Sequence, residues 1–207
     1  AIMFTPALQL LCGQYPDAEI DILTMFKGVA DIFERSEKIN KVYHWDFVKQ
    51  ETVRTLGFLR KLRRNKYDVS ITVFPANRRE YNILSFLIGA KKRIGTDYLH
   101  LNSSSFPFLL TDRTREDDSF HNVEENCRIV ELAGVTIPKE IPPLHIDVLP
   151  EDEIPAQTWL AKNLPQSDKQ TIIGIHAGSA TLKNQNNKRW DCKKCAELSK
   201  QHQKEDN

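Results

Sequence analysis

The sequence predicts an α/β protein with parallel sheets of the doubly wound type, divided into two domains of which the second is cut short. Short apolar runs rich in β-branched residues alternate with amphipathic segments along most of the 207 residues, which is the order of strands and helices in such sheets. Turns with small and cationic residues follow several of these runs, where open α/β sheets bind ligands. A stretch with four prolines, residues 136–150, is typical of a linker.

The strands are predicted from short segments in which apolar and β-branched residues dominate. They are residues 19–25, 40–45, 67–74, 91–95 and 171–175. The last of them, TIIGI, is a continuous apolar run, as expected for a strand covered on both faces. Residues 98–115 show no such run, so we expect them to form a loop.

The helices are predicted from apolar residues at helical spacing and from signals at helix ends. They lie within residues 1–15, 29–34, 51–65, 81–88, 121–134, 151–163 and 192–203. Thr5 and Pro6 are expected to be the N-cap and the first residue of the first helix. Gly134 is expected just beyond the end of the fifth, where a left-handed conformation favours glycine.

The linker predicts a first domain over residues 1–145. Residues 146–207 are then the start of a second domain. The second part holds one expected strand and two expected helices, too few to bury a core of normal size alone. The chain also opens in a helix, whereas doubly wound domains usually open with a buried strand. We therefore expect both ends of the architecture to lie outside this sequence.

Composition excludes several classes of protein. The formal net charge is +1, with 40% hydrophobic and 28% charged residues, so no global field attracts nucleic acid or a membrane. The apolar runs are far shorter than the roughly 20 residues of a membrane span. The four cysteines fit no disulfide framework, which predicts a reducing, cytoplasmic compartment. Cys192 and Cys195 form a CxxC that is either two helix residues one turn apart, or a redox motif or half a zinc site.

Residues 171–190, TIIGIHAGSATLKNQNNKRW, carry the clearest candidate site. Gly178 lets the backbone approach a ligand where the strand should end, and Ser179 offers a hydroxyl and an N–H. Lys188 and Arg189 precede a helix, and a helix N-terminus beside fixed cations suits phosphate. The alternative is a strand–loop–helix unit with a solvated basic loop.

The helix predicted at residues 51–65 combines an apolar stripe with a cationic last turn. The stripe consists of Val53, Leu56, Leu59 and Leu62, and the cations are Arg60, Lys61, Arg63 and Arg64. The cations complement the helix dipole. They form either a solvated helix end or a contact with an anionic lipid or acceptor.

Several stretches, taken in order, resemble glycosyltransferase family 9, the heptosyltransferases of lipopolysaccharide core synthesis. They are TPALQLLCGQYPDAEIDIL, YDVSITVFPANRREYNILSFLIGAKKRIG, HNVEENCRIVELAG and IIGIHAGSATLKNQNNKRWDCKKCAEL. The resemblance implies two Rossmann-like domains of the GT-B type with the active site between them. The first would bind a lipid-linked sugar acceptor and the second a nucleotide-activated heptose, typically ADP-heptose. It also implies an inverting reaction that needs no metal and no cofactor, in the cytoplasm or at the inner face of the inner membrane.

The same resemblance implies where the working residues lie. A general-base aspartate is expected in a Gly-Asp pair immediately before Ala1, and a donor-binding Asp-Thr-Gly segment beyond Asn207, so the chain alone is expected to be inactive. The donor-binding candidates are His176, Gly178, Ser179 and Lys188, with Lys183 as a rival to Lys188 because the loop looks longer than usual. The acceptor-binding candidates are Thr5, Asn77, Arg78, Arg79, His121 and Glu124. His121 can equally be a helix N-terminal residue satisfied by its neighbours.

A second hypothesis from another class is a noncatalytic α/β module that binds a nucleotide or phosphosugar. The residues upstream of Ala1 discriminate the two, since a strand ending in Gly-Asp supports the enzyme. A nicotinamide-dependent oxidoreductase is disfavoured because the sequence contains no GxGxxG.

In the enzyme that the resemblance implies, Lys188→Ala should lower kcat far more than it changes the KM for the acceptor. The reason is that Lys188 would meet charge that grows on the leaving diphosphate in the transition state. Steady-state kinetics should show a loss of about 10²-fold or more in kcat. If Lys188→Ala has a nearly unchanged kcat and Lys183→Ala a strongly lowered one, Lys183 and not Lys188 contacts the diphosphate.

Overall fold

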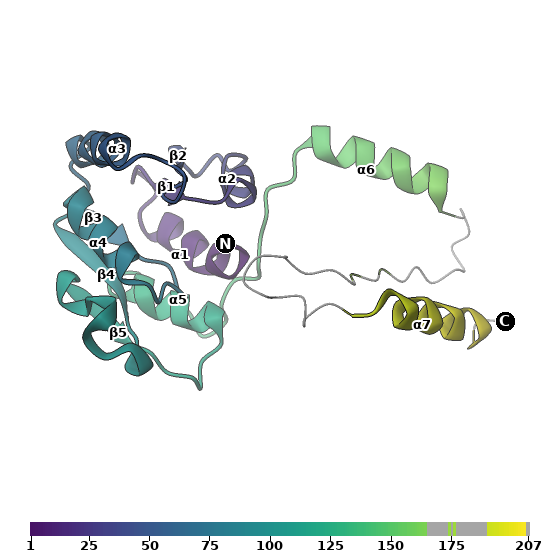
Figure 1. Ribbon diagram of the computed structural model, residues 1–207. Helices are drawn as coiled ribbons and strands as arrows, with labels where there is room; N and C mark the ends of the chain where they lie inside the picture. The colour runs from purple at the N-terminus through teal and green to yellow at the C-terminus, as the bar shows by residue number, and fades with distance from the viewer. Residues whose placement is uncertain (165–173, 175, 177–189, 206–207) are drawn as a thin grey trace. The chain divides into compact units, whose positions relative to one another are not determined.

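The computed structural model describes residues 1–164, 174, 176 and 190–205. The chain divides into two compact units, Ala1–Glu153 and Ile154–Asn207. The first unit contains every strand of the described part of the chain (Figure 1). It also contains most of the predicted linker, whose residues 136–149 have no helix or strand.

Five strands of the first unit form two parallel sheets. β1 (Asp21–Thr24) pairs with β2 (Lys41–His44), with Asp21 opposite Lys41. β4 (Lys92–Asp97) lies between β3 (Val69–Ile71) and β5 (Asp112–Arg115). All of these pairings are parallel, so the predicted α/β class with parallel sheets is confirmed.

α-Helices connect β1, β2, β3 and β4 in sequence order, and 3₁₀ turns connect β4 to β5. The helices of the first unit are α1 (Thr5–Gln14), α2 (Lys27–Phe33), α3 (Thr52–Arg64), α4 (Arg79–Ile88) and α5 (Asn122–Glu131), with 3₁₀ turns at Ile2–Phe4, Leu99–Ser105 and Pro107–Leu109. Gly134 follows α5 with φ +94°, the left-handed conformation that the sequence predicts there.

The expected loop at residues 98–115 is wrong in its last part, where the structure has β5. The sequence of this strand, DRTR, has no apolar residue, so a search for apolar runs misses it. The strand is held instead by its backbone ladder to β4 and by an inward-facing Thr114, whose hydroxyl lies 3.3 Å from that of Thr96. Arg113 and Arg115 on the same strand are exposed.

Thr5 is also not the helix cap that the sequence predicts. A 3₁₀ turn precedes α1, so Phe4 occupies the N-cap position. The Thr5 hydroxyl donates to the carbonyl of Ile2 at 2.9 Å and accepts the backbone N–H of His145 at 3.0 Å. Thr5 therefore fastens the linker to the start of α1.

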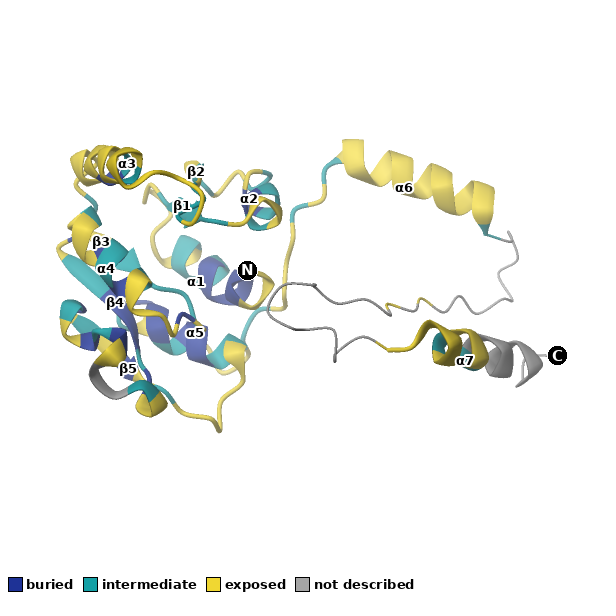
Figure 2. Ribbon diagram, viewed as in Figure 1, coloured by how far each residue is buried: buried dark blue, intermediate teal, exposed yellow. Residues whose placement is uncertain are grey.

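The core of the first unit lies where α1, α2 and α5 meet the strands. Its buried side chains are Phe4, Ala7, Leu8, Phe33, Cys127, Val130 and Val135. Ile22 of β1, Val42 of β2 and Ile71 of β3 pack against this cluster, so both sheets contribute to one core. Figure 2 shows the buried residues concentrated in α1, α5 and the middle of β4.

The second unit is described through two helices. These are α6 (Pro150–Asn163), which begins in the first unit, and α7 (Cys192–Glu205). α6 buries none of its residues. The strand predicted at residues 171–175 lies outside the described residues except for Gly174, which is exposed. In the described part of the chain, no helix is both long and apolar enough to cross a membrane.

The first turns of α5 hold two buried polar side chains that face the strand ends. Asn126 is fully buried; its amide accepts the N–H of Phe74 at 3.0 Å and donates to the Phe74 carbonyl at 3.2 Å. Glu125 is buried as well, and accepts the N–H of Asp117 at 2.9 Å and a bond from Arg128 at 2.9 Å. α5 thereby ties the segment after β3 to the segment after β5.

Asn126→Ala should lower the free energy of unfolding by about 2–4 kcal/mol, because it leaves both polar groups of the Phe74 backbone without their partner. Urea unfolding followed by circular dichroism measures the change. Asn122→Ala is the matched control: this exposed asparagine lies on the same helix, and its loss should cost no more than about 0.5 kcal/mol. Equal losses in the two variants would contradict the bracing role of Asn126.

Candidate functional site

The carboxyl ends of β3, β4 and β5 form the candidate site in the first unit. Parallel strands end at the same edge of a sheet, so the segments that follow them, residues 74–79, 98–100 and 115–118, gather there. Each segment is bonded to a neighbour; the bond of Tyr98 to Ala76 is buried, whereas those of Glu116 to Leu99 and His100 are exposed. The three segments therefore hold one another in position and are not independent loops.

Tyr98 connects the segment after β3 to the segment after β4. Its hydroxyl accepts the N–H of Ala76 at 2.6 Å, and its ring stacks on Phe74 with centroids 5.8 Å apart. Burial raises the pKa of Tyr98 to about 12, so the phenol stays neutral at physiological pH. Tyr98 thus positions the chain immediately before Asn77 and Arg78.

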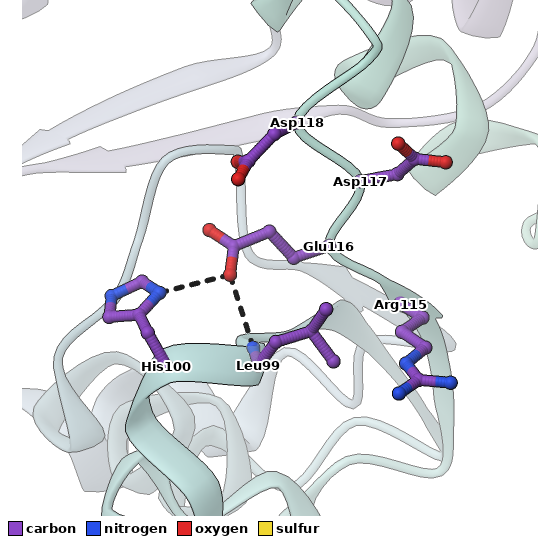
Figure 3. Close-up of a pocket in the computed structure, with 6 residues that line it drawn as sticks. All are labelled: Leu99, His100, Arg115, Glu116, Asp117 and Asp118. Atoms are coloured by element: carbon purple, nitrogen blue, oxygen red, sulfur yellow. Dashed lines mark hydrogen bonds and ion pairs between the residues drawn. The ribbon is translucent and has the colours of Figure 1, made fainter.

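Glu116 connects the segment after β4 to the segment after β5. One of its carboxylate oxygens accepts the N–H of Leu99 at 3.1 Å and lies 3.0 Å from Nδ1 of His100. Figure 3 shows the Glu116 and His100 side chains pointing toward each other across the opening. The Glu116 side chain is only 13% exposed, so this carboxylate is held in place.

These residues line a cavity of about 370 Å³ at the sheet edge (Figure 3). The lining residues are Leu99, His100, Arg115, Glu116, Asp117 and Asp118. The Asp117 carboxylate accepts bonds from the backbone and hydroxyl of Ser119, which hold its pKa below the usual range. The cavity therefore presents carboxyl oxygen acceptors beside a histidine and an arginine, groups that suit a polyhydroxylated ligand.

The predicted acceptor residues Asn77, Arg78 and Arg79 lie on the segment after β3 and are exposed. The Arg79 guanidinium is 3.8 Å from the Glu80 carboxylate and 5.9 Å from the centre of the Phe106 ring. For the Arg78 side chain, the described part of the chain shows neither a hydrogen bond nor an ion pair. Arg78 is consequently the more available of the two cations for an anionic ligand.

His121 and Glu124 lie at the start of α5, next to the same edge, and form a capping box. The His121 ring nitrogen accepts the N–H of Val123 at 3.3 Å, and the Glu124 carboxylate accepts the N–H of His121 at 2.7 Å. These bonds match the local alternative that the sequence left open for His121. An acceptor-binding role for either residue stays a prediction, as it does for the buried Thr5.

Sequence reasoning missed Tyr98, His100 and Glu116. The relevant signal was the end of β5, since a strand ending at Arg115 puts Glu116 at the carboxyl edge. Without that strand, the segments TDYLH and REDD showed no relation to each other.

The donor-binding candidates are described only in part. Gly178, Ser179, Lys183 and Lys188 lie outside the described residues, and their roles stay predictions. His176 is described and exposed. Cys192 is exposed and Cys195 half-buried on α7, and across the described residues no group of three or more histidine, cysteine or acidic side chains could hold a metal ion.

No protein-family profile matches the chain. Lipopolysaccharide heptosyltransferase 3 of Escherichia coli is 28% identical over 107 residues, which is 50% of this chain and 31% of that protein. The chain therefore spans about a third of the curated relative that it matches.

Among solved structures, the glycosyl transferase family 9 protein of Veillonella parvula DSM 2008 matches with a TM-score of 0.70 and 24% identity, over 96% of this chain and 54% of that one. The Escherichia coli heptosyltransferase WaaC with ADP-2-deoxy-2-fluoro heptose matches with a TM-score of 0.55 and 15% identity, over 67% of this chain and 46% of that one. In sequence the chain is thus similar to a lipopolysaccharide heptosyltransferase, and in fold to glycosyltransferase family 9, as the resemblance of its motifs predicts.

Proposed function

We propose that the chain contributes the acceptor-binding side of a glycosyltransferase that moves a heptose from ADP-heptose to the inner core of lipopolysaccharide. The observation that carries this proposal is the similarity to lipopolysaccharide heptosyltransferase 3 over half of the chain. WaaC, which shares the fold, was solved with ADP and with an ADP-heptose analogue, and this supports the choice of donor. The alternative of a noncatalytic phosphosugar-binding module shares the same edge site but predicts no transfer.

The proposed reaction is an inverting displacement without a metal. A hydroxyl of the acceptor attacks the anomeric carbon of the heptose, the bond to the diphosphate breaks, and the hydroxyl proton passes to a general base. Charge grows on the leaving diphosphate, so fixed cations and N–H donors lower the barrier there. On the donor side this role would fall to Lys188 or Lys183, with Gly178 and Ser179, and His176 beside them.

The edge site would hold the acceptor. Glu116 and Asp117 present carboxyl oxygens that accept hydrogen bonds from sugar hydroxyls, and His100 offers a ring nitrogen beside them. Asn77 and Arg78 lie on the segment that Tyr98 positions, so they can meet the phosphates of a phosphorylated core. The sugar and the phosphates would then be recognised by different segments of the same edge.

Arg78→Ala should weaken binding of a phosphorylated inner-core oligosaccharide by about 10-fold or more, since a charge-assisted hydrogen bond is lost. Titration of the chain followed by NMR chemical shifts measures the affinity and shows which amides move. The matched control is Arg54→Ala, an exposed arginine on α3 that pairs with Glu51 at 3.6 Å. After enzymatic removal of the phosphates, Arg78→Ala and the unchanged chain should bind equally. An oligosaccharide that shifts no amide in residues 74–79 or 98–118 would refute the assignment of the edge site.

Glu116→Gln should also lower the affinity for the oligosaccharide, by about 5- to 10-fold, because a neutral amide is a weaker acceptor for sugar hydroxyls than a carboxylate. Unlike the loss in Arg78→Ala, this loss should persist with the dephosphorylated oligosaccharide. Calorimetry with both ligands separates the two effects. A Glu116→Gln chain that binds the dephosphorylated ligand normally would remove the cavity from the acceptor site.

A further inference from the structure

Helix α3 has an inner face that packs against the first unit. Leu59 and Leu62 are 4% and 2% exposed, and Phe58 stacks on Trp45 with ring centroids 4.3 Å apart. The Trp45 indole donates to the hydroxyl of Thr55 at 3.2 Å. These contacts use residues at helical spacing on one side of α3, so the inner face is complete without the remaining apolar residues of the helix.

The predicted apolar stripe on α3 is correct only in its second half. Val53 is 80% exposed and Leu56 is 55% exposed, whereas Leu59 and Leu62 are buried. Residues spaced exactly three apart drift around a helix with 3.6 residues per turn, so the first two members of the stripe leave the inner face. Val53 and Leu56 consequently project from the surface of the unit.

The side of α3 that faces away from the core brings these apolar residues together with cations. We define the α3 outer face as Val53, Leu56, Gly57, Arg60, Arg63 and Arg64 of α3 with Leu87 of α4. Figure 2 shows α3 coloured mainly as exposed. An open groove of about 380 Å³ lies on this face. It is lined by Leu56, Gly57, Arg60, Arg63 and Leu87 of the outer face and by the buried Leu59. Arg63 donates to the Leu87 carbonyl at 3.2 Å and so fastens the two helices at this groove.

The cations of the outer face lack anionic partners in the described part of the chain. Glu51 is the one acidic residue among residues 51–66, and it pairs with Arg54, which lies beside the face. The described ion pairs include neither Arg60 nor Arg64. With a formal net charge of only +1 for the whole chain, this is a local concentration of positive charge and not a global one.

We propose that the α3 outer face docks on the surface of an anionic lipid bilayer. A free phosphate or a sugar phosphate would be attracted by the arginines but would gain nothing from exposed valine and leucine. A bilayer surface satisfies both, because apolar side chains enter the boundary between headgroups and acyl chains while arginines contact lipid phosphates. This inference goes beyond the proposed function and does not depend on it, since it concerns a face made of α3 and α4 alone.

The test is flotation of the chain with vesicles of phosphatidylcholine alone, or of phosphatidylcholine with about one third phosphatidylglycerol, an anionic lipid. The chain should float with the anionic vesicles and stay behind with the neutral ones. The bound fraction should fall as sodium chloride is raised from about 0.05 to 0.5 M, because salt screens the attraction.

Two variants separate the contributions. Arg60→Glu/Arg64→Glu should lower the partition coefficient for anionic vesicles by about 30-fold or more, from the loss of two cations near the surface. Val53→Ser/Leu56→Ser should also lower it, by about 5-fold or more, with the salt dependence retained. The matched control is Lys41→Glu/Lys139→Glu, which changes the net charge equally at two exposed lysines elsewhere and should bind as the unchanged chain does.

The remaining outcomes would overturn the proposal. Equal flotation with neutral and anionic vesicles, or no flotation with either, would remove the bilayer as the partner. Normal binding by Arg60→Glu/Arg64→Glu would place the lipid contact elsewhere. Binding that survives Val53→Ser/Leu56→Ser unchanged and is abolished by millimolar inorganic phosphate would identify an anion site in place of a docking face. Circular dichroism confirms that each variant folds.

Discussion

The candidate site depends on two buried polar side chains at the start of α5. Asn126 holds both polar groups of the Phe74 backbone, and Glu125 holds the N–H of Asp117. Buried side chains of this kind are costly unless every bond is made, so they allow one arrangement of the segments that they join. Tyr98 and Glu116 then complete the connections between neighbouring segments. Hydrogen bonds from α5 therefore fix the position of the segments at the sheet edge. The outer surface of these segments stays open to a ligand.

The sequence predicted those parts of the fold that have an apolar pattern. β1 to β4 and the helices between them are recognised because the burial that holds them also shapes their composition. β5 has no such pattern, since backbone bonds to β4 and one inward threonine hold it. The cap of α1 was misassigned for a related reason, because a 3₁₀ turn at Ile2–Phe4 depends on tertiary packing of Phe4 and not on a local signal.

The resemblance implied an acceptor role for Asn77 and Arg78; the structure has both exposed after β3, and their role stays a prediction. The candidate site could not be predicted where the chemistry depends on two segments meeting, as for Glu116 with Leu99 and His100. His121 and Glu124 show the opposite difficulty. The resemblance implied ligand binding for both, yet their polar groups already serve the first turn of α5. The donor-side residues 178, 179, 183 and 188 lie outside the described residues.

The polar character of β5 has a consequence for the behaviour of the protein in concentrated solution. This strand ends the order β3–β4–β5, so within the described part of the chain its outer backbone groups have no partner strand. Such an edge is a template on which another copy can add a strand and begin aggregation. Arg113 and Arg115 are exposed on β5, and Arg113 lies 3.7 Å from Asp97; in an approaching copy Arg115 in particular would meet its own like charge. The polar sequence that conceals the strand from a search for apolar runs is thus also expected to disfavour the addition of another strand at this edge.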